Sequence, residues 1–154
     1  MEWCVLGIMN PSILVLLLVL CTVLPTDGQD FQKFKAKHVK TANEMCTEEM
    51  KKINNSPELK VEKQKCKKKN TFILDTIDNI ETVCNITAYH KNYHKSNNTF
   101  TIVDCTAEDI NGDPCKYTGE KKNNAAIYIA CDQNKLPVHY GKPKNNKGKL
   151  NIFT

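Results

Sequence analysis

Two histidines and one lysine, widely spaced along the chain, carry the side chains needed to cleave a phosphodiester bond. His38 and His139 lie near the two ends of the chain that follows an apolar leader, and Lys67 lies between them. A neutral imidazole can accept a proton, a charged imidazole can donate one, and an ammonium group can stabilise negative charge on phosphoryl oxygens. A histidine with an ordinary pKa of about 6.5 populates both ring states near neutral pH. The chemistry needs all three together, because a lone histidine or lysine is most often only structural or solvated.

The first 28 residues are typical of a cleaved secretion signal. Ile13 to Leu24 form an apolar run, and Pro25, Thr26 and Gly28 follow it as a cleavage region. The run is shorter than the roughly 20 apolar residues that cross a bilayer, so we expect no membrane anchor. The sequence therefore predicts a signal peptide over 1–28, a secreted domain over 29–141 and a Lys/Asn-rich tail over 142–154.

The secreted part is basic and suited to disulfide bonds. All 22 basic residues are lysines, and the net charge of +5 becomes +7 when Glu2 and Asp27 leave with the signal. A polyanion is the expected partner, although a merely solubilising surface charge is nearly as common. An even number of cysteines in a secreted chain predicts disulfides, and their spacing lacks the close pairs of a zinc site. Their pairing is left open by the sequence alone; they are Cys46, Cys66, Cys84, Cys105, Cys115 and Cys131.

Helical periodicity comes first along the chain and strand periodicity after it. Phe31 and Phe34 indicate a first helix, a capping box at 41–44 starts a second, and Asp75 is the expected N-cap of a third. Alternation over 99–103, 126–130 and 136–140 predicts strands, the last with Val138 and His139 on opposite faces. This order favours an α+β domain with an antiparallel sheet.

The order of the motifs resembles the pancreatic ribonuclease superfamily. The resemblance is carried by Lys33-Phe34-x-x-Lys37-His38, by Cys66-Lys67-x-x-Asn70-Thr71-Phe72, which is the family's signature, and by Pro137-Val138-His139-Tyr140. It implies three short helices packed on a bent antiparallel β-sheet. It also implies three disulfides, Cys46–Cys105, Cys66–Cys115 and Cys84–Cys131. A fourth bridge of the family is missing, as in angiogenins and fish ribonucleases, and Asp113-Pro114-Cys115-Lys116-Tyr117 is also similar to the angiogenin branch.

The same resemblance implies a role for each site residue, without metal or cofactor. His38 would take the proton of a ribose 2′-hydroxyl, His139 would protonate the leaving 5′-oxygen, and Lys67 would stabilise the phosphoryl oxygens. The substrate would be single-stranded RNA and not DNA, because DNA has no 2′-hydroxyl to act as nucleophile. The resemblance implies that the RNA is cut 3′ of pyrimidines through a 2′,3′-cyclic phosphate. The implied substrate-binding residues are Lys33, Lys37, Asn70, Thr71, Asp104 as the partner of Thr71, and Tyr140.

Two positions depart from the family pattern. Lys37 stands where a glutamine is usual, and Gly141 replaces an aspartate that orients the second histidine. We expect the loss of that carboxylate to weaken catalysis without abolishing it.

Two other readings remain open. The chain could act mainly as a secreted cationic effector similar to angiogenin, binding heparan-like or bacterial surface polyanions with weak ribonuclease activity, or it could be an inactive secreted disulfide scaffold. In each case we expect a monomer. The lysines that suggest a polyanion patch, or else a solvated loop, are Lys60, Lys63, Lys65, Lys67, Lys68 and Lys69.

His90 and His94 could bind metal if helical, but an exposed loop is favoured. Glycosylation sequons start at Asn54, Asn85 and Asn97, and Asn54 is the weakest because Pro57 follows.

Overall fold

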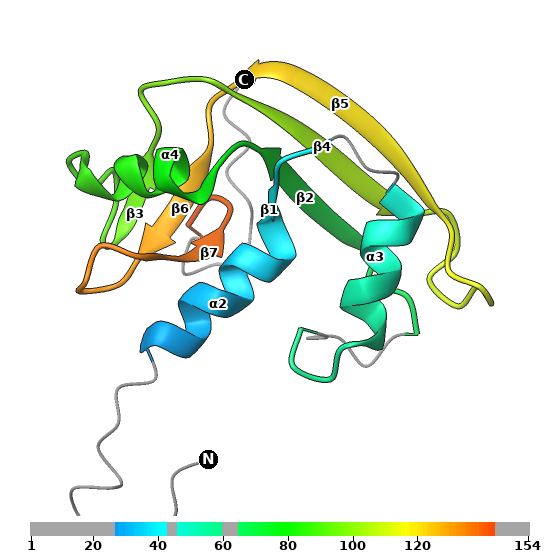
Figure 1. Cartoon of the computed structure of the whole chain (residues 1–154). Helices are drawn as coiled ribbons and strands as arrows, with labels where there is room; N and C mark the ends of the chain where they lie inside the picture. The colour runs from blue at the N-terminus through cyan, green and yellow to red at the C-terminus, as the bar shows by residue number, and fades with distance from the viewer. Residues whose placement is uncertain (1–26, 43–45, 60–64, 144–154) are drawn as a thin grey trace, which may run out of the picture.

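Within the residues that the structure describes, three α-helices pack against two β-sheets (Figure 1). The structure is a computed structural model that describes residues 27–42, 46–59 and 65–143. The larger sheet has the order β1-β2-β4-β5 and contains β1 (Val39–Lys40), β2 (Lys69–Leu74), β4 (Phe100–Ala107) and β5 (Tyr117–Ala125). The smaller has the order β3-β6-β7 and contains β3 (Tyr93–Lys95), β6 (Tyr128–Cys131) and β7 (Pro137–Tyr140). The predicted α+β class is confirmed, but the expected single antiparallel sheet is two sheets, and β1 pairs with β2 in parallel.

The helices lie close to the predicted places. They are α2 (Asp27–His38), α3 (Cys46–Asn55) and α4 (Ile77–Glu81), the last continued by a 3₁₀ turn over Thr82–Asn85. The prediction that Asp75 caps the third helix is wrong by one residue. Thr76 has the extended backbone of an N-cap and its hydroxyl accepts the Asn79 N–H, while Asp75 accepts the Thr76 N–H from outside the helix. The capping box expected at 41–44 runs into residues 43–45, which lie outside the described part.

The predicted strands correspond to β4, β6 and β7, and four further strands had no clear signal. β1 and β3 are only two and three residues long. Most of β5 is exposed and polar, so its sequence shows no alternation to recognise. In β7, Val138 is half-buried and His139 is exposed, in line with the predicted alternation.

Two apolar clusters form the core on either side of the larger sheet. Strand β2 contributes to both, because Ile73 packs with Phe34 in one cluster and Phe72 packs with Met50 in the other. The second cluster lies under α3, and the first joins α2, α4 and the smaller sheet. Because both faces of β2 are packed in these clusters, the strand and the residues at its start are held firmly in place.

Three disulfides cross-link the elements. They join Cys46 to Cys105, Cys66 to Cys115 and Cys84 to Cys131, the pairings that the resemblance implied. With sequence separations of 59, 49 and 47 residues, each should stabilise the fold by about 4 kcal/mol in the chain-entropy model. Gly119 lets β5 approach the first bridge, because a Cβ there would lie 2.7 Å from the Cys46 sulfur.

Several sequence predictions fall outside the described residues. These are the signal peptide up to residue 26, Lys60 and Lys63 of the lysine cluster, and the tail from residue 144 onward. Among the helices of the described ranges, none is long and apolar enough to cross a membrane.

Candidate active site

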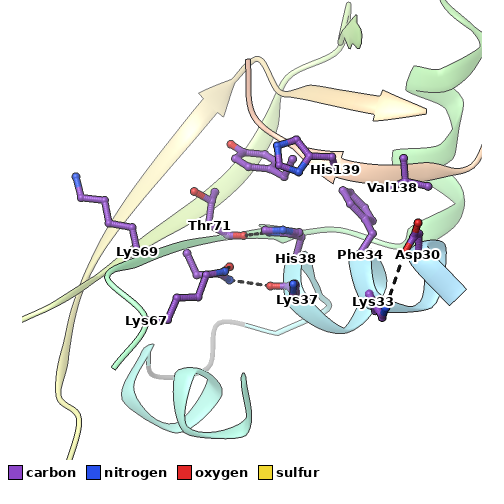
Figure 2. Close-up of a pocket in the computed structure, with 12 residues that line it drawn as sticks. Asp30, Lys33, Phe34, Lys37, His38, Lys67, Lys69, Thr71, Val138 and His139 are labelled. Atoms are coloured by element: carbon purple, nitrogen blue, oxygen red, sulfur yellow. Dashed lines mark hydrogen bonds and ion pairs between the residues drawn. The ribbon is translucent and has the colours of Figure 1, made fainter. Parts of the chain in front are cut away.

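The two histidines and the lysine line one cleft of about 530 Å³ (Figure 2). His38 is the last residue of α2, Lys67 directly follows the bridged Cys66, and His139 lies in β7. Every other predicted substrate-binding residue except Asp104 also lines this cleft, and Asp104 contacts one that does. The further lining residues, which were not predicted for the site, are Asp30, Phe34, Lys69 and Val138.

The ring of His38 is held in one orientation and one tautomer. Its Nδ1 lies 2.8 Å from the carbonyl oxygen of Thr71, and because a carbonyl only accepts, Nδ1 carries the hydrogen. The ring also packs between Phe34 and Tyr140, with 5.3 Å between ring centroids in each pair. The neutral ring therefore has its basic lone pair on Nε2.

Burial is the main reason that the pKa of His38 falls to about 3, and the positive charges of Lys67, Lys37 and His139 lower it further. The hydrogen bond to Thr71 opposes this shift. His38 is consequently neutral near physiological pH, as a proton acceptor must be. A phosphate anion in the cleft would offset the surrounding positive charges and raise the pKa of His38 toward the range where a base works best.

The ammonium group of Lys67 is anchored by Asn70. Lys67 Nζ donates to Asn70 Oδ1 at 2.7 Å, and Asn70 Nδ2 donates to the carbonyl of Lys37 at 2.7 Å. Asn70 is only 5% exposed, so the amide that makes both bonds is itself shielded from water. This amide thus ties the lysine to the end of the helix that carries His38.

The backbone of Lys67 is held by two residues that sequence reasoning missed for the site. Asn54 Oδ1 accepts the Lys67 N–H at 3.0 Å, and the Tyr117 hydroxyl donates to the Lys67 carbonyl at 2.7 Å. Asn54 Nδ2 in turn donates to the Tyr117 hydroxyl at 2.9 Å. Both polar atoms of the Asn54 amide are therefore used inside the fold, which adds a structural reason against this sequon, whereas Asn85 and Asn97 are exposed.

Thr71 and Asp104 form the expected pair on neighbouring strands. They are opposite each other in the β2–β4 register, and the Thr71 hydroxyl donates to Asp104 Oδ1 at 2.6 Å. Lys122, which was not predicted, donates to Asp104 Oδ2 at 2.8 Å. Burial and the nearby Asp104 carboxylate raise the pKa of Tyr140, so the phenol at this side of the cleft stays protonated.

Cations on α2 line one side of the cleft. Lys33 lies 3.8 Å from Asp30 one helical turn earlier. Burial, followed by the charge of Lys33, lowers the pKa of Lys37, whereas Asp30 raises it. Lys69 adds a further exposed ammonium at the start of β2. The cleft therefore offers several positive charges to an anionic ligand.

His139 is exposed and lines two pockets. Besides the main cleft it borders a second one of about 350 Å³, and its ring meets the edge of Tyr93 at a centroid distance of 6.2 Å. Gly141, where the resemblance implies that the family has an orienting aspartate, has a φ of +123°, which L side chains rarely adopt. The Tyr93 ring, rather than a carboxylate at 141, thus lies against this histidine.

His90 and His94 do not form the helical pair that metal binding would have needed. His94 lies in β3, half-buried, and its Nδ1 bonds the carbonyl oxygen of Ile86 at 2.7 Å. The expected exposed loop is therefore correct for His90, which is exposed, and wrong for His94.

The fold and the contents of the cleft are those of a small, disulfide-bonded ribonuclease. The family model described as pancreatic ribonuclease matches residues 29–141, and the chain belongs to this family. It is 32% identical over 142 residues to a delta-type pancreatic ribonuclease of Rattus tiomanicus, covering 82% of this chain and 90% of that protein. It is 34% identical over 147 residues to angiogenin-3 of Mus musculus, covering 86% of this chain and 94% of that protein. The X-ray structure of zebrafish RNase5 matches with a TM-score of 0.65 at 32% identity, over 79% of this chain and 99% of that one.

Proposed function

We propose that the protein is a secreted endoribonuclease that cleaves single-stranded RNA 3′ of pyrimidines through a 2′,3′-cyclic phosphate. Membership of the pancreatic ribonuclease family makes RNA the substrate class. The observation that carries the finer proposal is that His38, Lys67 and His139 line the same cleft although they come from distant parts of the chain.

The proposed reaction uses these three side chains in one in-line displacement. His38 Nε2 takes the proton of the ribose 2′-hydroxyl, and the 2′-oxygen forms a bond to phosphorus. The bond from phosphorus to the 5′-oxygen breaks, and the charged His139 ring gives its proton to that oxygen. Negative charge grows on the phosphoryl oxygens during this step, and the anchored Lys67 ammonium stabilises it.

The Thr71 hydroxyl is the group that we infer reads the base. Its proton is given to Asp104, so its oxygen can accept a hydrogen bond from the N3–H of uracil. The N3 of cytosine is itself an acceptor, and the hydroxyl would have to leave Asp104 to donate to it. This arrangement favours uridine over cytidine at the cleaved position.

Cleavage of a uridine-containing dinucleotide in the presence of EDTA tests the proposal. We expect His38→Ala and His139→Ala each to lower kcat/KM by about 10²- to 10⁴-fold, because each removes one proton transfer. Lys67→Met should lower it strongly too, whereas Lys116→Met, the same change at an exposed lysine outside the cleft, should not. Wild-type cleavage no faster than that of a folded His139→Ala variant would overturn the proposal.

A second candidate function is that of a secreted cationic effector. It is favoured by the net charge of +7 after removal of residues 1–28 and by the similarity to angiogenin-3. Binding to heparan-like or bacterial polyanions would then need charge rather than turnover. Bactericidal or vessel-forming activity that survives in His139→Ala would assign that activity to the effector function.

We also infer secretion with removal of residues 1–28 and a monomeric state. N-terminal sequencing of protein recovered from culture medium tests the cleavage site. Sedimentation velocity of that protein tests the monomer, and a dimer would contradict it.

A further inference from the structure

Tyrosines and lysines gather on the outer face of the smaller sheet, beside His139. Strand pairing places Tyr93, Ala130 and His139 in one row across β3, β6 and β7. The next row on the same face contains Lys95 and Tyr128, because residues two apart in a strand point to the same side. The face that presents His139 therefore continues directly into this second row.

The second row holds two ammonium groups around one ring. Lys142 Nζ lies 4.9 Å and Lys95 Nζ 5.9 Å from the centroid of the Tyr128 ring. Attraction between a cation and an aromatic ring favours these positions over free motion in water. Two positive charges are thus concentrated at one point of the sheet surface.

A third tyrosine adds an open ring to this group. Tyr89 meets Tyr128 edge-on at a centroid distance of 5.7 Å and is still 60% exposed, the one large hydrophobic side chain of the described residues that is exposed. Its backbone is fixed, since its N–H donates to the carbonyl of Tyr93 at 2.7 Å. A ring held outward on a rigid backbone offers its face to a planar ligand at little cost in conformational entropy.

We propose that Tyr89, Lys95, Tyr128 and Lys142, here called the tyrosine–lysine platform, bind the part of a single-stranded RNA that lies 3′ of the cleaved bond. An exposed aromatic face that can stack on a base, next to ammonium groups that can contact the backbone, is the chemistry of single-strand binding. Tyr89 supplies the stacking ring, Tyr128 supports it, and the two lysines contact phosphate. The strand polarity rests on the proposed function, in which His139 protonates the 5′-oxygen of the departing 3′ segment.

Binding of oligonucleotides that cannot be cleaved tests the platform separately from catalysis. Fluorescence anisotropy would compare a 2′-O-methyl pyrimidine–purine dinucleotide with versions extended by three nucleotides at the 3′ or the 5′ end, using protein made without N-glycans. We expect the 3′ extension to tighten binding by about tenfold or more, and Tyr89→Leu to remove most of that gain. Tyr89→Phe keeps the ring and should keep the gain.

A charge variant and its matched control test the lysines. Lys142→Gln should weaken binding of the 3′-extended oligonucleotide and reduce the slope of log Kd against log salt by about one. Lys116→Gln makes the same charge change at an exposed lysine just before β5 of the larger sheet and should leave the gain from the 3′ extension unaltered.

Two results would overturn the platform. One is an equal gain from the 3′ extension in Tyr89→Leu and in wild type. The other is a loss of heparin binding in the platform variants with no loss of RNA binding, which would assign this face to a sulfated polysaccharide. A wild-type protein that cleaves no RNA would refute the proposed function instead, and the anisotropy measurements would still decide whether the platform binds nucleic acid.

Discussion

The amide of Asn70 provides the sharpest test of how the cleft positions its cation. Asn70→Ala removes the bond that holds the Lys67 ammonium and the bond to the carbonyl of Lys37. A hydrogen bond between neutral groups contributes about 1 kcal/mol and one to a charged group about 1.5 to 3 kcal/mol. We therefore expect the free energy of unfolding to fall by about 2 to 4 kcal/mol. A domain with three disulfides should remain folded after such a loss.

The effect on catalysis follows from the charged bond alone. If Asn70 holds the Lys67 ammonium where the phosphoryl oxygens develop charge, its loss removes at most the contribution of that bond, so kcat/KM should fall by about 10- to 100-fold. Urea unfolding measures the stability, and cleavage of a uridine-containing dinucleotide measures kcat/KM. Asn98→Ala, the same substitution at an exposed asparagine, should change neither.

A double-mutant cycle separates positioning from general damage. Asn70→Ala should lower kcat/KM in wild type but hardly at all in a Lys67→Met background, because the group that it positions is then absent. An equal loss in both backgrounds would show that Asn70 does not act through Lys67, and the reasoning would be refuted.

Three further outcomes are expected. Burial lowers the pKa of His38 to about 3, and only the neutral ring accepts a proton, so kcat/KM measured from about pH 3 to pH 8 should lose activity on the acidic side only below about pH 6.5. An acidic limb at or above about pH 6.5 would contradict the assignment of His38 as the base. Glu49 is 2% exposed and pairs with both Lys40 and Lys52, so Lys40→Met should lower the free energy of unfolding, measured in urea, by about 3 kcal/mol. Lys52→Met should lower it less, because the Lys52 side chain is 65% exposed. Asp104→Ala should lower the preference for uridine over cytidine by about fivefold, because the Thr71 hydroxyl, no longer bonded to Asp104, can then donate to cytosine. An unchanged ratio of kcat/KM for uridine to kcat/KM for cytidine would count against the proposed recognition of the base by Thr71.

The sequence predicted best where residue type and motif act together. His38, Lys67 and His139 were recognisable because their chemistry is specific and their flanking motifs are distinctive, and the structure brings all three to one cleft. Strands with one buried face were also predictable, since alternation reveals them. β5 was not, because nearly all of its side chains are exposed and no buried face marks its sequence.

Residues that support the site through contacts distant in sequence could not be predicted in this way. Asn54 and Tyr117 reach the Lys67 backbone from 13 and 50 residues away, and Lys122 reaches Asp104 from 18. Nothing local distinguishes these three from other polar residues, since only the folded register brings them to their partners. The cap of α4 shows the same limit on a smaller scale, because adjacent Asp and Thr side chains are both good caps.

The Cys66–Cys115 bridge has a consequence for where the protein can work. Cys66 immediately precedes Lys67, so the covalent link and the cation share one short piece of backbone. In a thiol-rich cytosol this link would open, and the lysine would lose the support on which its alignment depends. We expect dithiothreitol to abolish RNA cleavage and reoxidation to restore it. A cell that makes this protein would then be protected from its own product until the chain has passed through an oxidising compartment.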